Sequence, residues 1–260
     1  MLRTYMATVV GLEPGVLMHS TAGMAGMSGR EAQRRELAKL AKVTAGKRTP
    51  PQNHRMAQIE TDFSIYWDHN ERPYLPPATF RAAIEKAARM TKDGPRVRRG
   101  VRILATTFDS PVIDGRDRPE IIEAAMFSTV VRVGRQSVIR TRGLFYPWQA
   151  TITIAADDAA NQDDLAEWLT RAGNYIGVGD WRPDCSGVYG RFIVDDIGPG
   201  IAARTTTGRH PTTGTHTPGP AGKKPSIGRA GSANSAASLR RQKGTTFATH
   251  RRPICGPSGM

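Results

Sequence analysis

Cysteine and long apolar runs are scarce in this chain. Its two cysteines, Cys185 and Cys255, belong to no CxxC pair and have no nearby histidine pair at ligand spacing, so neither a structural disulfide nor a zinc site is indicated. The apolar stretch near the N-terminus is interrupted by Glu13 and Pro14, which makes it too short for a membrane span and unlike a signal peptide. We therefore expect a cytoplasmic protein that has no membrane partner and uses no metal or other cofactor.

Acidic residues are missing from residues 198–260, which hold ten of the chain's 37 Lys and Arg residues and none of its 23 Asp and Glu residues. This segment carries +10 of the formal net charge of +14, and residues 1–197 carry the remaining +4. Large apolar residues are also few there and follow no period, so burial cannot offset the entropy of ordering the segment. We predict a domain over 1–197 and a disordered basic tail over 198–260, which is either an extension without a role or a polyanion-binding arm.

Hydrophobic periodicity predicts an α+β domain with an insertion. Strands are expected over 4–12, 101–106, 127–133, 149–156 and 188–196, and helices after Pro77 and between Asn161 and Gly173. A basic helix over 30–42 and a linker-like break over 45–53 form an insertion at about 20–60. Without insertions the order is strand, helix, strand, strand, helix, strand. That order predicts a ferredoxin-like, RRM-type fold, an antiparallel sheet with two helices.

The segment from Gly173 to Arg191, GNYIGVGDWRPDCSGVYGR, combines five glycines with aromatic and basic residues before the expected last strand. It has no GK[ST] and no third glycine at dinucleotide spacing, so it is neither a P-loop nor a dinucleotide fingerprint. Glycine lets a backbone approach a ligand closely, while Trp181, Arg182 and Tyr189 offer stacking faces and charge. The combination suits a sugar-phosphate chain. The alternative is a connecting loop that uses glycine only to turn.

Two segments together resemble a known family. NERPYLPPATFRAAIEKAAR, residues 70–89, is similar to the signature that opens the first helix of RAMP superfamily proteins, the RRM-like backbone subunits of CRISPR effector complexes. A Gly-rich loop before the last strand is that superfamily's other hallmark, and GLEPGVLMHS, residues 11–20, is similar to the strand and turn with which such subunits begin. The resemblance spans about residues 4–196. Pro77, Ala78 and Thr79 replace the family's Gly-Ser-Ser, and Arg81 with Ala82 replaces its Lys-Gly, which indicates a divergent or stand-alone relative.

Arginines outside the expected core supply the electrostatic part of the predicted nucleic-acid binding. One cluster precedes the strand at 101–106, and another surrounds the following hairpin, where Phe145, Tyr146 and Trp148 are candidates for base stacking. For any single residue the alternative to a nucleic-acid contact is that the arginine is simply solvated or that the aromatic side chain belongs to the core. The predicted nucleic-acid contacts are Arg81, Arg98, Arg99, Arg140, Arg142, Gly177, Gly179, Trp181, Arg182, Gly187, Tyr189 and Arg191.

The resemblance and the charge pattern predict a non-catalytic protein that binds single-stranded RNA and assembles along it as a homo-oligomer or a multi-subunit ribonucleoprotein. These residues do not separate RNA from single-stranded DNA. No carboxylate pair lies at metal-binding spacing, so no metal or catalytic residue is predicted. Two alternatives stay open: an RNA endonuclease of the same fold that uses His19 or Asp68, and a structural or assembly protein of a phage or other mobile element. The residues weighed for catalysis are His19, Asp62, Asp68, His69, Asp109 and Asp180.

Overall fold

The computed structural model describes residues 2–20, 30–133, 136–158 and 160–200. The predicted tail from 201 onward, Cys255 and residues 21–29 of the predicted insertion lie outside these residues. The described part is mixed α and β, with antiparallel sheets and six α-helices. The strands are β1 (Arg3–Gly11), β2 (Val16–Leu17), β3 (Val101–Asp109), β4 (Met126–Val133), β5 (Gln136–Phe145), β6 (Gln149–Ala156) and β7 (Phe192–Pro199). The α-helices are α1 (Glu31–Lys42), α2 (Pro50–Ser64), α3 (Pro77–Arg89), α4 (Gly94–Gly100), α5 (Arg118–Ala125) and α6 (Gln162–Arg171). Shorter helical turns are η1 (Ala45–Lys47), η2 (Ala172–Ile176) and η3 (Pro183–Cys185).

Strands β3, β6, β1 and β7 form a four-stranded sheet in that order, and each neighbouring pair is antiparallel. Tyr5 and Ala7 of β1 pair with Ile154 and Ile152 of β6, and all four side chains are buried. Side chains two positions apart on a strand point to the same face, so these residues line one apolar face of the sheet. The buried face predicted from the alternation over 149–156 is therefore confirmed.

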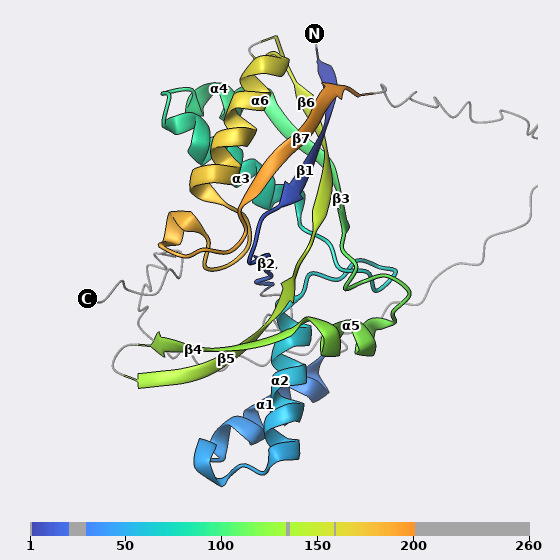
Figure 1. Ribbon diagram of the computed structural model, residues 1–260, viewed down its shortest axis with the longest axis vertical. Helices are drawn as coiled ribbons and strands as arrows, with labels where there is room; N and C mark the ends of the chain where they lie inside the picture. The colour runs from blue at the N-terminus through green and yellow to red at the C-terminus, as the bar shows by residue number, and fades with distance from the viewer. Residues whose placement is uncertain (1, 21–29, 134–135, 159, 201–260) are drawn as a thin grey trace, which may run out of the picture. The chain divides into compact units, whose positions relative to one another are not determined.

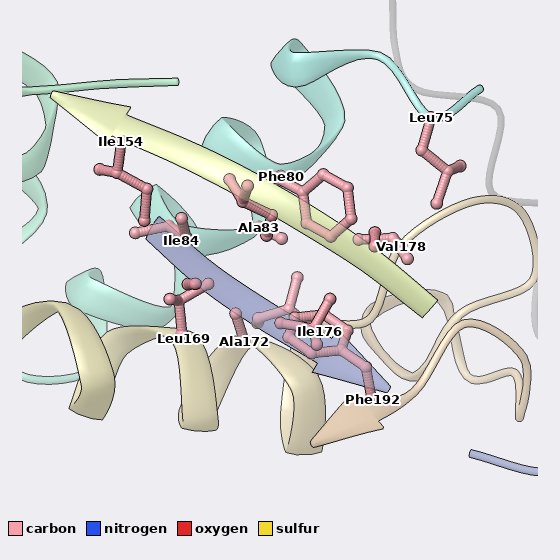
Figure 2. Close-up of a cluster of buried hydrophobic side chains, with 14 of the residues drawn as sticks. Leu75, Phe80, Ala83, Ile84, Ile154, Leu169, Ala172, Ile176, Val178 and Phe192 are labelled. Atoms are coloured by element: carbon pink, nitrogen blue, oxygen red, sulfur yellow. The ribbon is translucent and has the colours of Figure 1, made fainter. Parts of the chain in front are cut away.

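Helices α3 and α6 cover this apolar face (Figure 1). Figure 2 shows Phe80 and Ile84 of α3 and Leu169 of α6 gathered beside β1 and β6. Both helices lie where the sequence predicts them. Helix α3 begins at Pro77, and α6 follows Asn161, whose side-chain oxygen accepts a hydrogen bond from the Asp164 N–H at 2.8 Å. This N-cap satisfies one of the free amides at the start of α6.

Strands β2, β5 and β4 form a second antiparallel sheet, in which one edge of β5 is covered by α2. The Thr141 N–H donates to Glu60 Oε2 at 2.9 Å, and the Gly143 N–H donates to Ser64 Oγ at 2.8 Å. The two acceptors lie four residues apart on the helix, a rise of roughly 6 Å, which matches the roughly 7 Å between alternate strand residues. Side chains of α2 thus satisfy strand amides that no neighbouring strand reaches.

Helix α2 begins inside the linker-like break expected over 45–53 and replaces its last four residues. Pro50 and Pro51 stand in the first turn of the helix, where proline loses no hydrogen bond, and Thr49 with Gln52 forms a capping box. The prolines that suggested a break therefore start a helix. With α2, α4 and α5, the described part has more helices than the two core helices and one inserted helix that were predicted. The helix predicted over 30–42 is present as α1, Glu31–Lys42.

The last strand begins at Phe192 rather than Val188. Gly190 has a φ of +72°, and its N–H donates to Gly15 O at 2.7 Å, so residues 188–191 belong to the preceding loop. A positive φ is incompatible with a regular strand. The prediction of the strand's start was wrong because the glycine turn cannot be seen in the apolar alternation.

Gly190→Ala is expected to lower the free energy of unfolding by about 3–5 kcal/mol. A Cβ at this position would lie 1.7 Å from Val178 O, and the φ of +72° adds strain. Gly115→Ala is the matched control, because Gly115 has a φ of +66° but nothing within 4 Å of such a Cβ. It should cost only the conformational term of roughly 1–2 kcal/mol. Urea titration followed by circular dichroism measures both, and equal losses would contradict the close packing at Gly190.

Candidate functional site

The Gly-rich loop, residues 177–191, joins η2 to β7 and folds back on the segment after β1. Its Asp180 N–H donates to Leu17 O at 2.8 Å, and its Gly190 N–H donates to Gly15 O. At Gly179 a Cβ would lie 2.3 Å from Leu17 O, and φ is +77°. Only glycine allows this approach. The loop is therefore a packed structure with a defined backbone.

Two of the glycines predicted to hold phosphate use their amides in hydrogen bonds to the protein's own backbone. The Gly177 N–H donates to Ala172 O at 2.7 Å, and the Gly187 N–H donates to Arg182 O at 3.0 Å. A backbone amide that already has an acceptor offers no second hydrogen to a ligand. Contacts between this loop and an anion are thus left mainly to side chains.

A cleft of about 220 Å³ lies between the Gly-rich loop and α3. Three predicted contacts, Gly177, Gly179 and Arg182, line it, together with Lys86 of α3, which the sequence analysis did not single out. The side chains of Lys86 and Arg182 are 38% and 25% exposed, so both reach solvent at the mouth. The cleft thus has a cationic entrance.

Asp184 compensates both cations at this entrance. Its carboxylate contacts Lys86 Nζ and lies 3.4 Å from Arg182 Nη2, while Arg182 Nη1 donates to Gly179 O at 3.0 Å. A carboxylate shared by two cations leaves one net positive charge at the mouth. It also holds both side chains in position, so an incoming anion would compete with Asp184 for cations that are already oriented.

His19 lines the cleft as a neutral side chain. Burial, and then the charges of Arg142 and Arg182, lower the pKa of His19 from 6.5. Tyr66, which also lines the cleft, donates its hydroxyl hydrogen to His19 O at 2.7 Å. A neutral imidazole carries one donor and one acceptor nitrogen. The wall of the cleft can therefore both give and take hydrogen bonds.

An aromatic row continues from the cleft mouth along the Gly-rich loop. Trp181 is 41% exposed, its ring centroid is 5.9 Å from that of Tyr189, and Tyr189 is 6.0 Å from Phe127 of β4. Trp181 and Tyr189 are both predicted contacts, and the fold brings them together although eight positions separate them. Trp181 directly precedes Arg182, one of the cations at the mouth.

Two predicted cations near α3 are already ion-paired. Arg98 donates to Glu85 Oε1 at 2.8 and 3.0 Å, and Arg81 Nη1 lies 3.7 Å from Glu85 Oε2. Hydrogen bonds from Arg98 and Arg89 lower the pKa of Glu85, which keeps this carboxylate charged. Arg99 is exposed and forms no ion pair within the described residues. Of this cluster, Arg99 is the cation most available to a polyanion.

The hairpin cations are also compensated. Arg140 Nη1 lies 3.8 Å from Glu60 Oε1, and Arg142 contacts Asp180 of the Gly-rich loop. Arg142 thus helps to join the loop to β5. Arg191, at the end of the loop, is exposed and has no ion-pair partner among the residues that the structure describes.

The aromatic residues suggested for stacking at the hairpin divide between core and surface. Phe145 and Trp148 are 0% and 2% exposed and belong to the core, so they are unavailable to a base. Tyr146 is 45% exposed. The core alternative stated for Trp148 is the one that the structure bears out, because its ring stacks on Phe108 at 6.0 Å.

The acidic candidates for catalysis have structural partners. Asp62, 2% exposed, accepts hydrogen bonds from Arg118 at 2.8 and 3.1 Å, and the Arg118 guanidinium lies over the Trp67 ring. Asp68 Oδ1 accepts from two backbone amides of its own turn, and Asp109 Oδ1 accepts from the Ser110 N–H. Among the described residues, no group of three or more His, Cys, Asp or Glu side chains is placed to hold a metal ion.

Sequence reasoning missed Lys86, Tyr66 and Asp184. Lys86 lies three positions after Ala83 on α3, so its place beside the buried face of that helix was readable from the period. Its contact with Asp184 joins residues 98 positions apart, and no local pattern reports such a pair. No sequence motif or periodic pattern pointed to Tyr66 as a residue of the cleft.

No model of a known protein family matches the chain, and no curated protein matches it. Within the part that the structure describes, no helix has the length and apolar character that crossing a bilayer requires.

We expect the folded state to lose stability as the pH falls below about 6.5, because the lowered pKa of His19 means that the unfolded chain binds a proton more readily. His19→Gln should reduce this loss, whereas His69→Gln, at an exposed position, should keep it. Urea midpoints at about pH 7.5 and about pH 5.5 measure the effect. The same pH dependence in wild type and His19→Gln would contradict this assignment.

Proposed function

We propose that the chain is a non-catalytic protein that binds single-stranded RNA along the Gly-rich loop. The observation that carries the proposal is an exposed indole, Trp181, directly before a cation at the mouth of a cleft, Arg182. Bases stack on exposed aromatic side chains and phosphates follow cationic grooves with little regard to sequence. Single-stranded DNA offers both groups as well, so contacts to the 2′-hydroxyl would decide between the two.

The backbone of Trp181 supports its role as the stacking residue. Its φ is +47°, a value that is unusual for a bulky side chain and costs roughly 1–3 kcal/mol. Contacts within the loop hold it there, since Trp181 O accepts from the Tyr189 N–H at 3.1 Å and the two rings pack together. Strain of this kind is typical of residues that a site holds in a fixed direction.

We further propose that the four-stranded sheet is a ferredoxin-like, RRM-type domain of a divergent RAMP superfamily member. Support comes from the strand order β3-β6-β1-β7, with α3 between β1 and β3 and α6 between β6 and β7 along the chain. RRM sheets stack bases on aromatic side chains of their central strands. Here the face opposite the helices carries Met6, Thr8, Thr151 and Thr153 on the central strands and no aromatic side chain, so we expect bases at the loop.

We also propose that copies of the chain assemble along the bound strand through the β4–β5 hairpin. Val130 and Ile139 pair across this hairpin and are 63% and 65% exposed. Apolar surface left in water becomes favourable to bury against a neighbouring subunit. A head-to-tail contact of this hairpin with the next copy would let the assembly extend along a strand.

Trp181→Ala is expected to weaken binding to a fluorescent oligouridylate about tenfold or more, since one stacked base contributes roughly 1–3 kcal/mol. Tyr175→Ala is the control, because Tyr175 is 58% exposed outside the loop and should change affinity by less than about twofold. Anisotropy titrations over a salt series measure both, and affinity should fall steeply with salt. Equal effects of the two variants would contradict stacking on Trp181, and a flat salt dependence would remove the electrostatic part. Intact RNA on a gel separates binding from cleavage.

Ile139→Glu is expected to reduce the multimer that forms on long RNA while it leaves affinity for a short oligonucleotide within about twofold. Leu104→Glu is the matched control, since Leu104 is 57% exposed on β3 and away from the hairpin. Sedimentation velocity with long and short RNA measures the mass of each complex. Multimers that are unchanged by Ile139→Glu, or equally reduced by Leu104→Glu, would exclude the hairpin as the contact.

A further inference from the structure

The cleft between the Gly-rich loop and α3 is apolar at its bottom. Leu75, Ala83, Ile176 and Val178 line it and are at most 8% exposed. Figure 2 shows Leu75 and Val178 at one end of the core cluster, with Ile154 at the other. An anion placed on such a surface loses hydration without gaining a hydrogen bond. A flat, weakly polar ring gains from the same surface.

The volume of the cleft limits what fits. At about 220 Å³ it lies below the range of roughly 300–1,000 Å³ that holds drug-sized ligands. This is room for one small ring system and too little for a stack of bases. A base that enters must first leave its neighbours, which costs least when the strand is already single.

The polar groups of the wall suit the edge of such a ring. The neutral imidazole of His19 has one donor and one acceptor nitrogen, and the Tyr66 hydroxyl, whose hydrogen goes to His19 O, keeps an acceptor oxygen. A nucleobase edge presents donors and acceptors side by side. A phosphate at neutral pH mainly accepts, so this mixed wall is better matched to a base.

The cations stand at the mouth, above the apolar bottom. Lys86 and Arg182 are more exposed than the residues below them, and Asp184 orients both. A nucleotide with its base inside the cleft would bring its phosphate to this level. From the bottom of the cleft to its mouth, the surface changes from apolar to polar to cationic. A nucleotide changes in the same order, from base to sugar to phosphate.

We propose that the cleft binds one unstacked nucleotide, with its base on the apolar bottom beside His19 and Tyr66 and its phosphate between Lys86 and Arg182. The inference rests on the proposed function, because a strand held along the Gly-rich loop presents its nucleotides at the cleft mouth. It divides the binding between two places. Trp181 stacks on a base outside the cleft, and α3 forms one wall of a pocket for another.

Calorimetric titration of the full chain with uridine and adenosine monophosphates, and with inorganic phosphate, tests the inference. Ala82 lines the cleft from an exposed position of α3, so Ala82→Leu narrows the cleft with a residue that favours helix. Ala78→Leu is the matched control, at an exposed position of the same helix that does not line the cleft. We expect Ala82→Leu to weaken nucleotide binding about tenfold or more and Ala78→Leu to change it by less than about twofold. The basic residues of 201–260 are the same in all these variants, so any anion binding by them does not affect the comparison between variants.

Asp184→Asn should strengthen binding of the monophosphates severalfold, because it frees both cations, and should leave binding of uridine, which has no phosphate, unchanged. Inorganic phosphate that binds as tightly as a monophosphate, or an Ala82→Leu variant with wild-type affinity, would overturn the inference. If oligouridylate binds while neither monophosphate does, this inference fails and the proposed function stands. If wild-type protein does not bind oligouridylate, the proposed function itself fails.

Discussion

Main-chain hydrogen bonds between the Gly-rich loop and the segment after β1 hold the candidate site together. The Gly190 N–H donates to Gly15 O and the Asp180 N–H donates to Leu17 O. Val178, in the same loop, is fully buried. The backbones approach so closely that a Cβ at Gly179 would lie 2.3 Å from Leu17 O and one at Gly190 1.7 Å from Val178 O, so both positions require glycine. The cleft exists because the loop is fixed on one side and α3 on the other. A site built this way is formed before any ligand arrives.

Much of the charge within residues 1–197 is arranged as local ion pairs. Residues 1–197 carry a formal +4, and the arginines near α3 and at the hairpin meet carboxylates of Glu85, Glu60 and Asp180. Exposed pairs of this kind contribute little stability but fix where the guanidinium groups lie. Within these residues, uncompensated positive charge lies at the cleft mouth and at exposed arginines such as Arg99 and Arg191. Orientation, more than total charge, determines where a strand would be held.

Hydrophobic periodicity correctly predicted the elements that pack on the core. Prediction failed where one local residue pattern is compatible with two structures. The stripe of α3 and the alternation of β6 are visible because burial on one face repeats at a fixed interval. Pro50 and Pro51 signal a break or a helix start equally well, and only the capping by Thr49 and the packing of α2 on β5 select the helix. For the site, the glycines and Trp181 stood out in the sequence. Lys86 and Asp184 did not, because their contact spans 98 positions and depends on the finished fold.

Helix α2 protects one edge of β5 from pairing with other chains. Glu60 and Ser64 accept hydrogen bonds from two β5 amides that could otherwise pair with a strand of another chain. These side chains satisfy the amides and do not extend the sheet. An uncovered strand edge is a template for pairing with another chain. Shortened versions that lack α2 would expose this template on the same hairpin that carries two large apolar side chains in water. Residues 50–53, the end of the predicted linker-like break, thus begin the helix that covers this strand edge.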